Sequence, residues 1–265
     1  MKKSKKIWGF EVNSIGVGTW GVGGWFKADT RYDEEQIEAI RHSLKKGQNH
    51  IDTAEMYSSG HSEEIVGEAI KGFDRKKLFI ASKVYRNNAT ADLVPKATER
   101  ILKRLQTEHL DLLYIHACFN EGDIKEYVAG LNKAQDEGYA RAIGVSNFNL
   151  RQLKKAISLT KNPIVALQNH YNVMYQEEVD EEVKIYCAKN NITIVAYKPL
   201  ENCESGKEVL QMAEKYDKTP QQIALNWLIN QENVVTITKS EDKKHIDENL
   251  RALDFKMEKE DYFNN

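Results

Sequence analysis

Ionisable side chains follow successive apolar runs of this sequence, at the point where each run ends. Asp52 closes the second run, and Tyr57 lies five residues beyond it. Lys83 lies near the end of the third run, and His116 closes the fourth. Side chains of these types can donate, accept or hold a proton during a reaction. Because burying such groups without partners costs free energy, their recurrence at the ends of apolar runs favours a site for acid–base chemistry.

The other apolar runs also end in polar, aromatic or glycine residues. These are Gly18, Thr19 and Trp20 after the first run, Ser146 and Asn147 after the fifth, Gln168 and Asn169 after the sixth, Tyr197 after the seventh, and Lys239 and Ser240 after the eighth. Taken singly, each of these residues has an ordinary structural explanation, such as a turn residue or a lysine whose stem lies along the surface. Only their shared position at the ends of the runs indicates a site.

Eight runs are the candidate strands that would carry these residues. They cover residues 14–19, 49–53, 78–84, 110–116, 142–146, 165–168, 193–196 and 234–237. Most are nearly continuous in apolar residues, as in ITIVAY and KLFIASKV. That pattern is typical of parallel strands that are buried on both faces.

Amphipathic segments of helical period alternate with the candidate strands. Clear examples are residues 33–46, with Asp33 as the expected N-cap, residues 92–105 and 180–189, and the segment that Thr219 and Pro220 open. Eight strands interleaved with helices predict a (β/α)8 barrel, formed by residues 1–265 as a single domain. Residues 5–12 precede the first strand and are expected to form a small hairpin at the bottom of the barrel. In such a barrel, active sites lie at the carboxyl ends of the strands, where the polar groups described above would meet.

A doubly wound sheet is the main alternative architecture. It normally carries a G-x-G-x-x-G segment between its first strand and first helix. The glycines at positions 16, 18, 21, 23 and 24 do not have that spacing followed directly by a helix. Residues 20–28 are therefore predicted to form a loop.

The composition excludes several classes of protein. The 265 residues carry a net charge of −2, which does not suggest binding to nucleic acid or to an anionic membrane. No apolar stretch approaches the length of a membrane span, and no signal-peptide core follows the basic start, residues 1–6, which is expected to be a solvated terminus. Three widely spaced cysteines, Cys118, Cys187 and Cys203, suggest neither a zinc site nor a disulfide framework. A cytoplasmic location is the simplest expectation.

Five segments together resemble the aldo-keto reductase family. IDTAEMYSSGHSEEIVGEAI is similar to the family signature, ASKV to its lysine-bearing strand, and LDLLYIHACF to its histidine-bearing strand. RAIGVSNF contains the family segment G-V-S-N-F, and VVTITKS followed by HIDEN resembles the cofactor segment near the C-terminus. The resemblance extends over residues 15–249, with the five segments in the family's order.

The resemblance implies a catalytic tetrad of Asp52, Tyr57, Lys83 and His116. Hydride transfer to a carbonyl group produces an alkoxide that needs a proton donor. Free tyrosine titrates near about 10, and a neighbouring lysine is expected to lower that pKa. The aspartate would hold the lysine charged, and a neutral histidine would orient the carbonyl oxygen. No metal is required because the cofactor supplies the hydride.

The resemblance also implies contacts to a nicotinamide cofactor. Ser146, Asn147 and Gln168 would hold the carboxamide, Tyr197 would stack on the nicotinamide ring, and Lys239, Ser240, His245 and Asn249 would lie at the adenosine end. Gly18, Thr19, Trp20, Pro199 and Leu200 are further expected contacts. The expected cofactor is NADP(H). NAD(H) remains open because His245 occupies the position where many family members have an arginine for the 2′-phosphate, and a histidine cannot make a bidentate phosphate contact.

The sequence specifies the substrate and the direction of the reaction less closely than it specifies the reaction class. The chain ends soon after Phe263, and the segment after His116 is short, so an open pocket with relaxed substrate choice is expected. The partners would be a small carbonyl or alcohol compound, with the chain as a monomer or small homo-oligomer. Two alternatives remain: a sugar or alcohol dehydrogenase acting in the oxidative direction, and a non-catalytic nicotinamide-sensing subunit.

Overall fold

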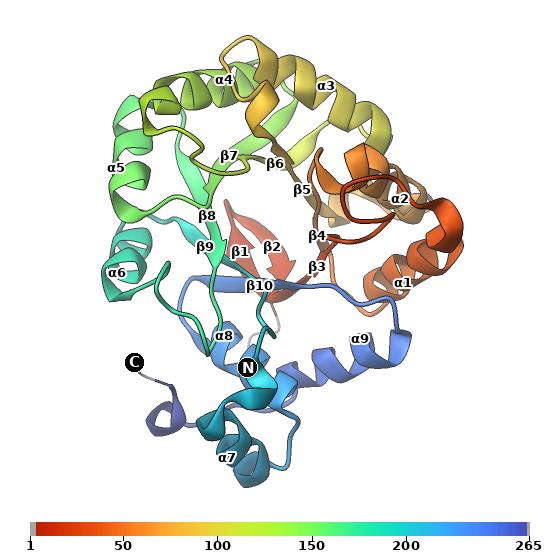
Figure 1. The fold of residues 1–265 in the computed structure, drawn as a ribbon, viewed down its shortest axis with the longest axis vertical. Helices are drawn as coiled ribbons and strands as arrows, with labels where there is room; N and C mark the ends of the chain where they lie inside the picture. The colour runs from red at the N-terminus through yellow and green to blue at the C-terminus, as the bar shows by residue number, and fades with distance from the viewer. Residues whose placement is uncertain (1–3, 264–265) are drawn as a thin grey trace.

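A closed barrel of eight parallel strands, surrounded by helices, forms the centre of the molecule (Figure 1). The computed structural model describes residues 4–263. Around the barrel the strand order is β10-β3-β4-β5-β6-β7-β8-β9, so strands adjacent in the sequence are also adjacent in space. The barrel closes where β10 pairs with β3, through Thr236 beside Ile15 and Thr238 beside Val17. The predicted (β/α)8 fold is confirmed.

All eight predicted strands are present, and their ends differ from the predicted ones by no more than two residues. The barrel strands are β3 (Ile15–Gly18), β4 (His50–Asp52), β5 (Phe79–Val84), β6 (Leu110–Ile115), β7 (Ala140–Ser146), β8 (Ile164–His170), β9 (Thr193–Tyr197) and β10 (Val234–Thr238). Nearly all of their residues are buried, as the continuous apolar runs predicted. The loop prediction for residues 20–28 is also confirmed, since this segment contains turns and bends without a helix or strand.

Nine α-helices lie outside the barrel in the part of the chain that the structure describes. They are α1 (Asp33–Lys45), α2 (His61–Ile70), α3 (Leu93–Leu105), α4 (Ile124–Asp136), α5 (Leu150–Leu159), α6 (Glu181–Lys189), α7 (Lys207–Tyr216), α8 (Pro220–Asn230) and α9 (Lys243–Leu250). Thr219 caps α8 through a capping box with Gln222. The predicted cap at Asp33 is wrong, because Tyr32 occupies the N-cap position of α1 and Asp33 begins the helix. The Asp33 carboxylate lies 3.0 Å from Nε2 of His61 instead, which joins α1 to α2.

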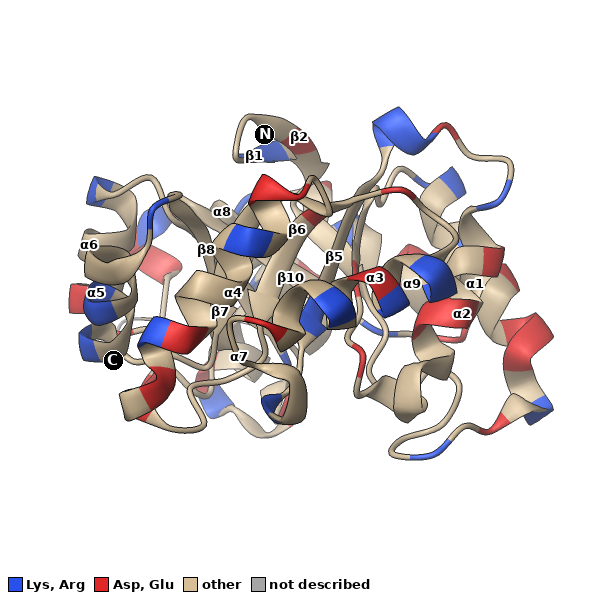
Figure 2. Ribbon diagram, turned by 90° about the horizontal axis from the view of Figure 1, so that it is seen from above, with Lys and Arg blue, Asp and Glu red and all other residues tan. Residues whose placement is uncertain are grey.

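A two-stranded hairpin closes one end of the barrel, as predicted (Figure 2). It consists of β1 (Ser4–Ile7) and β2 (Phe10–Asn13), paired antiparallel. Ile7 and Val12 of the hairpin pack with Phe79, the first residue of β5. The hairpin therefore covers the amino ends of the strands and leaves the carboxyl ends open.

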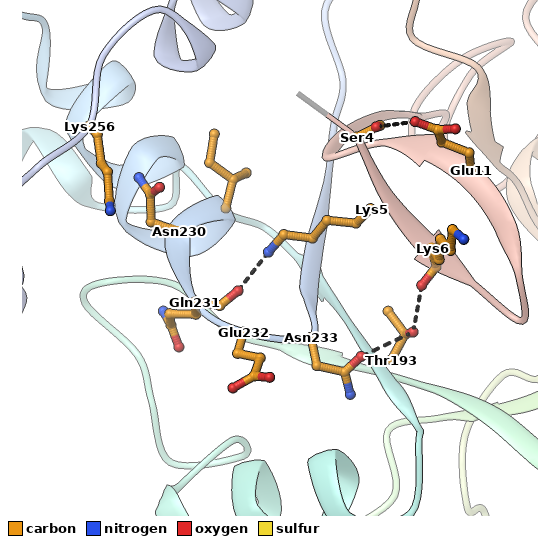
Figure 3. A pocket seen from close by; sticks show the side chains of 11 residues that line it. Ser4, Lys5, Lys6, Glu11, Thr193, Asn230, Gln231, Glu232, Asn233 and Lys256 are labelled. Atoms are coloured by element: carbon orange, nitrogen blue, oxygen red, sulfur yellow. Dashed lines mark hydrogen bonds between the residues drawn. The ribbon is translucent and has the colours of Figure 1, made fainter. Parts of the chain in front are cut away.

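Lys5 ties the hairpin to the C-terminal end of α8 (Figure 3). Its ammonium group donates hydrogen bonds to the backbone carbonyls of Gln231, at 2.6 Å, and Val234, at 2.5 Å. Burial lowers the pKa of Lys5 to about 8. The expectation of a solvated basic terminus is thus wrong for Lys5, because the segment from the C-cap of α8 to the start of β10 presents carbonyl groups to the hairpin. Residues 1–3 of that basic run lie outside the described residues.

Basic and acidic residues are interspersed along the outer helices (Figure 2). Several form pairs between neighbouring helices, such as Arg104 of α3 with the buried Glu63 of α2, at 2.6 Å. Within residues 4–263, none of the helices combines the length and apolar character needed to cross a membrane.

Candidate active site

A cleft of about 580 Å³ lies at the carboxyl ends of the barrel strands. Most of the predicted site residues line it: Gly18, Thr19, Trp20, Asp52, Tyr57, His116, Ser146, Asn147, Gln168, Tyr197, Pro199 and Lys239. A larger cavity of about 770 Å³ lies at the opposite end, between the hairpin and α8, and includes Lys5 and Asn230 (Figure 3). The predicted ionisable groups gather only in the first of these two cavities.

Asp52, Lys83 and Tyr57 form a continuous contact beneath this cleft. Asp52 ends β4, Lys83 lies on the neighbouring strand β5, and Tyr57 follows β4 in a short turn. The Lys83 ammonium donates to Oδ1 of Asp52 at 2.5 Å and to the Tyr57 hydroxyl at 3.3 Å. It also donates to the backbone carbonyl of Thr53 at 2.9 Å. Both charged side chains are only 1% exposed, so their attraction is little screened by water.

Burial and neighbouring charges determine the protonation states of Lys83 and Tyr57. Burial by itself lowers the pKa of Lys83, but the charge of Asp52 and the hydrogen bonds to Asp52 and Tyr57 raise it above its ordinary value. Burial raises the pKa of the Tyr57 hydroxyl, and the Lys83 charge opposes this rise without cancelling it. The expected net lowering of the Tyr57 pKa is therefore wrong for this structure, although the direction of the Lys83 effect is as expected. Tyr57 is a protonated hydroxyl at neutral pH, beside a charged ammonium group.

His116 lines the cleft directly after β6, the strand that pairs with the strand of Lys83. Its ring centroid is 5.7 Å from that of Tyr57, with the two rings nearly perpendicular at 76°. Burial and the Lys83 charge lower the pKa of His116 to about 3, so the imidazole is neutral at physiological pH. Its buried Nδ1 atom has no hydrogen-bond partner among residues 4–263. A neutral imidazole in this place can donate to an oxygen atom in the cleft.

Gln168 makes a contact that the sequence analysis did not foresee. Its Nε2 donates to Oδ2 of Asp52 at 2.8 Å, so this carboxylate is held by Lys83 on one oxygen and by Gln168 on the other. Gln168 lies on β8 and Asp52 on β4, on opposite sides of the barrel. No local sequence signal indicates a pair separated by 116 residues.

Asn147 and Tyr197 are also joined directly. The Tyr197 hydroxyl donates to Oδ1 of Asn147 at 2.7 Å, and Nδ2 of Asn147 donates to the backbone carbonyl of His116 at 2.8 Å. The Tyr197 ring stacks on the ring of His170, with centroids 5.5 Å apart and planes at 16°. This places the Tyr197 ring at the edge of the cleft with one face supported by His170.

The turn after Tyr57 fixes the loop of residues 20–28, here called the aromatic loop, beside the cleft, and this contact was not predicted from the sequence. Ser58 and Ser59 have left-handed backbones, with φ of 52° and 58°. The Ser58 hydroxyl donates to the carbonyl of Val22 at 2.9 Å, and the Ser59 hydroxyl donates to that of Phe26 at 2.9 Å. Left-handed conformations are uncommon outside glycine and cluster at functional sites. Two adjacent serines before a glycine were the available signal.

Trp20 and Trp25 belong to this aromatic loop and line the cleft. The Trp20 ring lies 5.4 Å from that of Trp25 and 4.9 Å from that of Tyr57, in tilted edge-to-face contacts. Trp25 is 58% exposed. The loop therefore makes one wall of the cleft largely aromatic.

The remaining predicted residues do not meet in the cleft. Leu200, Ser240, His245 and Asn249 lie away from its described lining. The Ser240 hydroxyl donates to the backbone carbonyl of Asp242 at 3.1 Å, close to the start of α9. The His245 side chain is 64% exposed, and its Nδ1 lies 4.0 Å from a carboxylate oxygen of Asp242. Within residues 4–263, no group of three potential metal ligands is placed to hold an ion.

Comparisons with known proteins agree with this architecture. The sequence matches the profile of the aldo/keto reductase family over residues 14–203 and 201–264. It is 35% identical over 242 residues to a glyoxal reductase of Bacillus subtilis, with 90% of this chain and 84% of that protein aligned. The fold is similar to that of a thermostable aldo-keto reductase crystallised with the inhibitor epalrestat, with a TM-score of 0.92, 38% identity, and coverage of 97% of this chain and 96% of that chain.

A second similar structure is that of an aldo-keto reductase from Klebsiella pneumoniae in complex with NADPH. It has a TM-score of 0.85 and 29% identity, and the match covers 94% of this chain and 88% of that chain. Matches of sequence and fold over almost the whole length thus accompany the cleft and its buried aspartate–lysine–tyrosine contact. The chain belongs to the aldo/keto reductase family.

Proposed function

We propose that this protein reduces aldehydes or ketones to alcohols with NADPH as the hydride donor, and that Tyr57 is its general acid. The observation that carries this proposal is the position of Lys83, whose ammonium contacts both the Asp52 carboxylate and the Tyr57 hydroxyl. A hydroxyl in contact with a buried cation is suited to releasing a proton when negative charge develops beside it. A sensor of nicotinamide would not need such a group.

The cleft suits a nicotinamide dinucleotide in its donor set. Tyr197 presents an aromatic ring for stacking, and Asn147 and Gln168 present amides that can pair with a carboxamide. At the other end, Lys239 supplies a cation for phosphate. The similar Klebsiella enzyme was crystallised with NADPH, which supports the same cofactor here. When bound, the reduced cofactor supplies the hydride for the carbonyl carbon.

The proposed roles of the four site residues follow from their contacts. The Tyr57 hydroxyl donates a hydrogen bond to the carbonyl oxygen and passes its proton there as negative charge develops. Lys83 stabilises the phenolate that remains, and Asp52 keeps Lys83 charged and oriented. His116, which is neutral, donates a second hydrogen bond to the same oxygen and fixes its direction. The aromatic wall formed by Trp20 and Trp25 excludes water from one side of the reacting group.

Aldehyde-dependent oxidation of NADPH tests the proposed reaction. Glyoxal and methylglyoxal are suitable first substrates, because reductases of these names are among the relatives. We expect the absorbance of NADPH to fall only when a carbonyl compound is present, and one alcohol to form for each NADPH consumed. Saturable cofactor binding without turnover across a panel of aliphatic and aromatic carbonyl compounds would favour a sensing role instead.

A substitution at His245 tests the proposed adenosine end of the site. We expect His245→Arg to strengthen NADPH binding by about 1–3 kcal/mol, the range for a hydrogen bond to a charged group, and to change NADH binding little. The reason is that arginine offers a forked cation to the 2′-phosphate, whereas the exposed histidine does not. Fluorescence titration of both cofactors measures this difference. An equal gain for NADH and NADPH would show that position 245 does not face the 2′ substituent.

A further inference from the structure

Lys239, the cation proposed for the cofactor phosphate, is already paired with a carboxylate of this chain. Its ammonium lies 2.9 Å from Oε1 of Glu241, and Lys239 itself lines the cleft. The side chains are 33% and 42% exposed, so the pair is accessible to a ligand but partly shielded from solvent. Any phosphate that binds Lys239 must share this cation with Glu241 or displace it.

The Glu241 carboxylate is held in place from its other side. Nε2 of Gln36 donates to the same Oε1 atom at 2.8 Å. Gln36 is a buried residue of α1, and its own Oε1 accepts from the backbone N–H of Gly23 at 2.7 Å. Although burial tends to raise the pKa of Glu241, the hydrogen bonds from Lys239 and Gln36 lower it overall. Glu241 is thus an ionised carboxylate in a fixed position, anchored to the same aromatic loop that forms the wall of the cleft.

The other two lysines of residues 239–244, Lys243 and Lys244, are also paired with carboxylates. The Lys243 ammonium lies 3.7 Å from a carboxylate oxygen of Glu38, and that of Lys244 lies 3.9 Å from one of Glu248. Each lysine of residues 239–244 therefore has a carboxylate within 4.0 Å. The basic appearance of this segment in the sequence does not translate into a strongly positive surface.

The two nicotinamide cofactors differ only at the 2′ position of the adenosine ribose. A carboxylate and a cation beside that position have opposite effects on which cofactor is preferred. A carboxylate accepts hydrogen bonds from the 2′-hydroxyl of NAD(H), whereas a cation accommodates the 2′-phosphate of NADP(H). We propose that Glu241 is a specificity-determining residue, which occupies Lys239 and accepts from the ribose hydroxyl, and so narrows the preference of this enzyme for NADPH over NADH. This inference rests on the proposed cofactor site. It assigns to Glu241 a function in choosing between cofactors.

Removal of the Glu241 charge tests this inference through binding alone. We expect Glu241→Gln to tighten NADPH binding by about ten- to a hundredfold, since one charged hydrogen bond is worth that factor, and to leave NADH binding equal or weaker. Trp20 and Trp25 line the cleft, so quenching of their fluorescence reports occupancy by either cofactor without turnover. Glu38→Gln is the matched control, because it removes a carboxylate from a lysine of the same segment but not from Lys239. The control should leave the ratio of the two dissociation constants unchanged.

A competition experiment places the effect at the 2′ position. Adenosine 2′,5′-bisphosphate should displace NADH more strongly from Glu241→Gln than from the wild type, whereas 5′-AMP should displace NADH equally from both. Glu241→Asp keeps the charge on a shorter side chain and should stay close to the wild-type ratio of dissociation constants. If Glu241→Gln leaves that ratio unchanged while the wild type binds both cofactors, the proposed role of Glu241 in cofactor choice is wrong. If neither cofactor quenches the wild type, the proposed function itself is wrong.

Discussion

Tyr57→Phe should reduce carbonyl reduction by about a hundred- to ten-thousandfold, the usual contribution of a general acid. The substitution removes the hydroxyl that contacts Lys83 and keeps the ring that packs against Trp20 at 4.9 Å. Cofactor binding should therefore remain close to wild type. Single-turnover mixing of the enzyme–NADPH complex with an aldehyde measures the chemical step without product release.

The control for this variant is Tyr139→Phe. Tyr139 also uses its hydroxyl, which donates to Glu99 at 2.6 Å, but it lies on the surface away from the cleft. We expect that variant to react at the wild-type rate. If Tyr57→Phe keeps more than about a tenth of the wild-type single-turnover rate, a loss far below that expected for a general acid, then Tyr57 is not the acid.

Lys83→Met should lower activity and also destabilise the fold. The side chain keeps its length, but the buried Asp52 carboxylate loses its cation and retains Gln168 as partner. Breaking a buried ion pair by removing one member typically costs about 3–5 kcal/mol. Urea unfolding measures this loss. The double variant Asp52→Asn with Lys83→Met should recover much of the stability, because no unpaired charge remains, but should not recover the activity.

The pH profile gives Lys83→Met a second, independent outcome. Reduction needs Tyr57 protonated, so the rate falls as pH rises through the Tyr57 pKa. The Lys83 charge holds that pKa below the value that burial alone would give. Its removal should therefore move the alkaline limb of the profile to higher pH. A lower rate with an unshifted limb would indicate that Lys83 is needed only for folding.

The barrel was predictable because each strand is specified by a local pattern. Parallel strands buried on both faces require continuous apolar residues, and short β-branched runs such as ITIVAY meet that requirement. The start of α8 is likewise specified locally, by Thr219 as the N-cap and Pro220 as the first helical residue. Asp33 shows the limit of such signals. It has the right residue type for a cap, but His61 from another helix competes for its carboxylate.

The site was predictable as a set of positions but not as a network. Strand ends place Asp52, Lys83 and His116 together whatever their side-chain rotamers. The bond from Gln168 to Asp52 depends on which rotamers meet across the barrel, and so does the pair of Lys239 with Glu241. The net rise of the Tyr57 pKa depends on how fully the ring is buried, which residue spacing does not specify.

The closure of the barrel has a consequence for synthesis of the chain. Asp52, Tyr57, Lys83 and His116 all belong to the first half of the sequence, but β3 gains its second neighbour only when β10 (Val234–Thr238) is made. Lys5 likewise can form its hydrogen bonds to the carbonyls of Gln231 and Val234 only after those residues are made. Contacts between such distant segments slow folding, and a strand edge left unpaired invites association with other chains. While it is still on the ribosome, the nascent protein therefore carries the residues proposed for proton transfer on an incomplete barrel with an unpaired strand edge, which late closure or chaperones must protect from association.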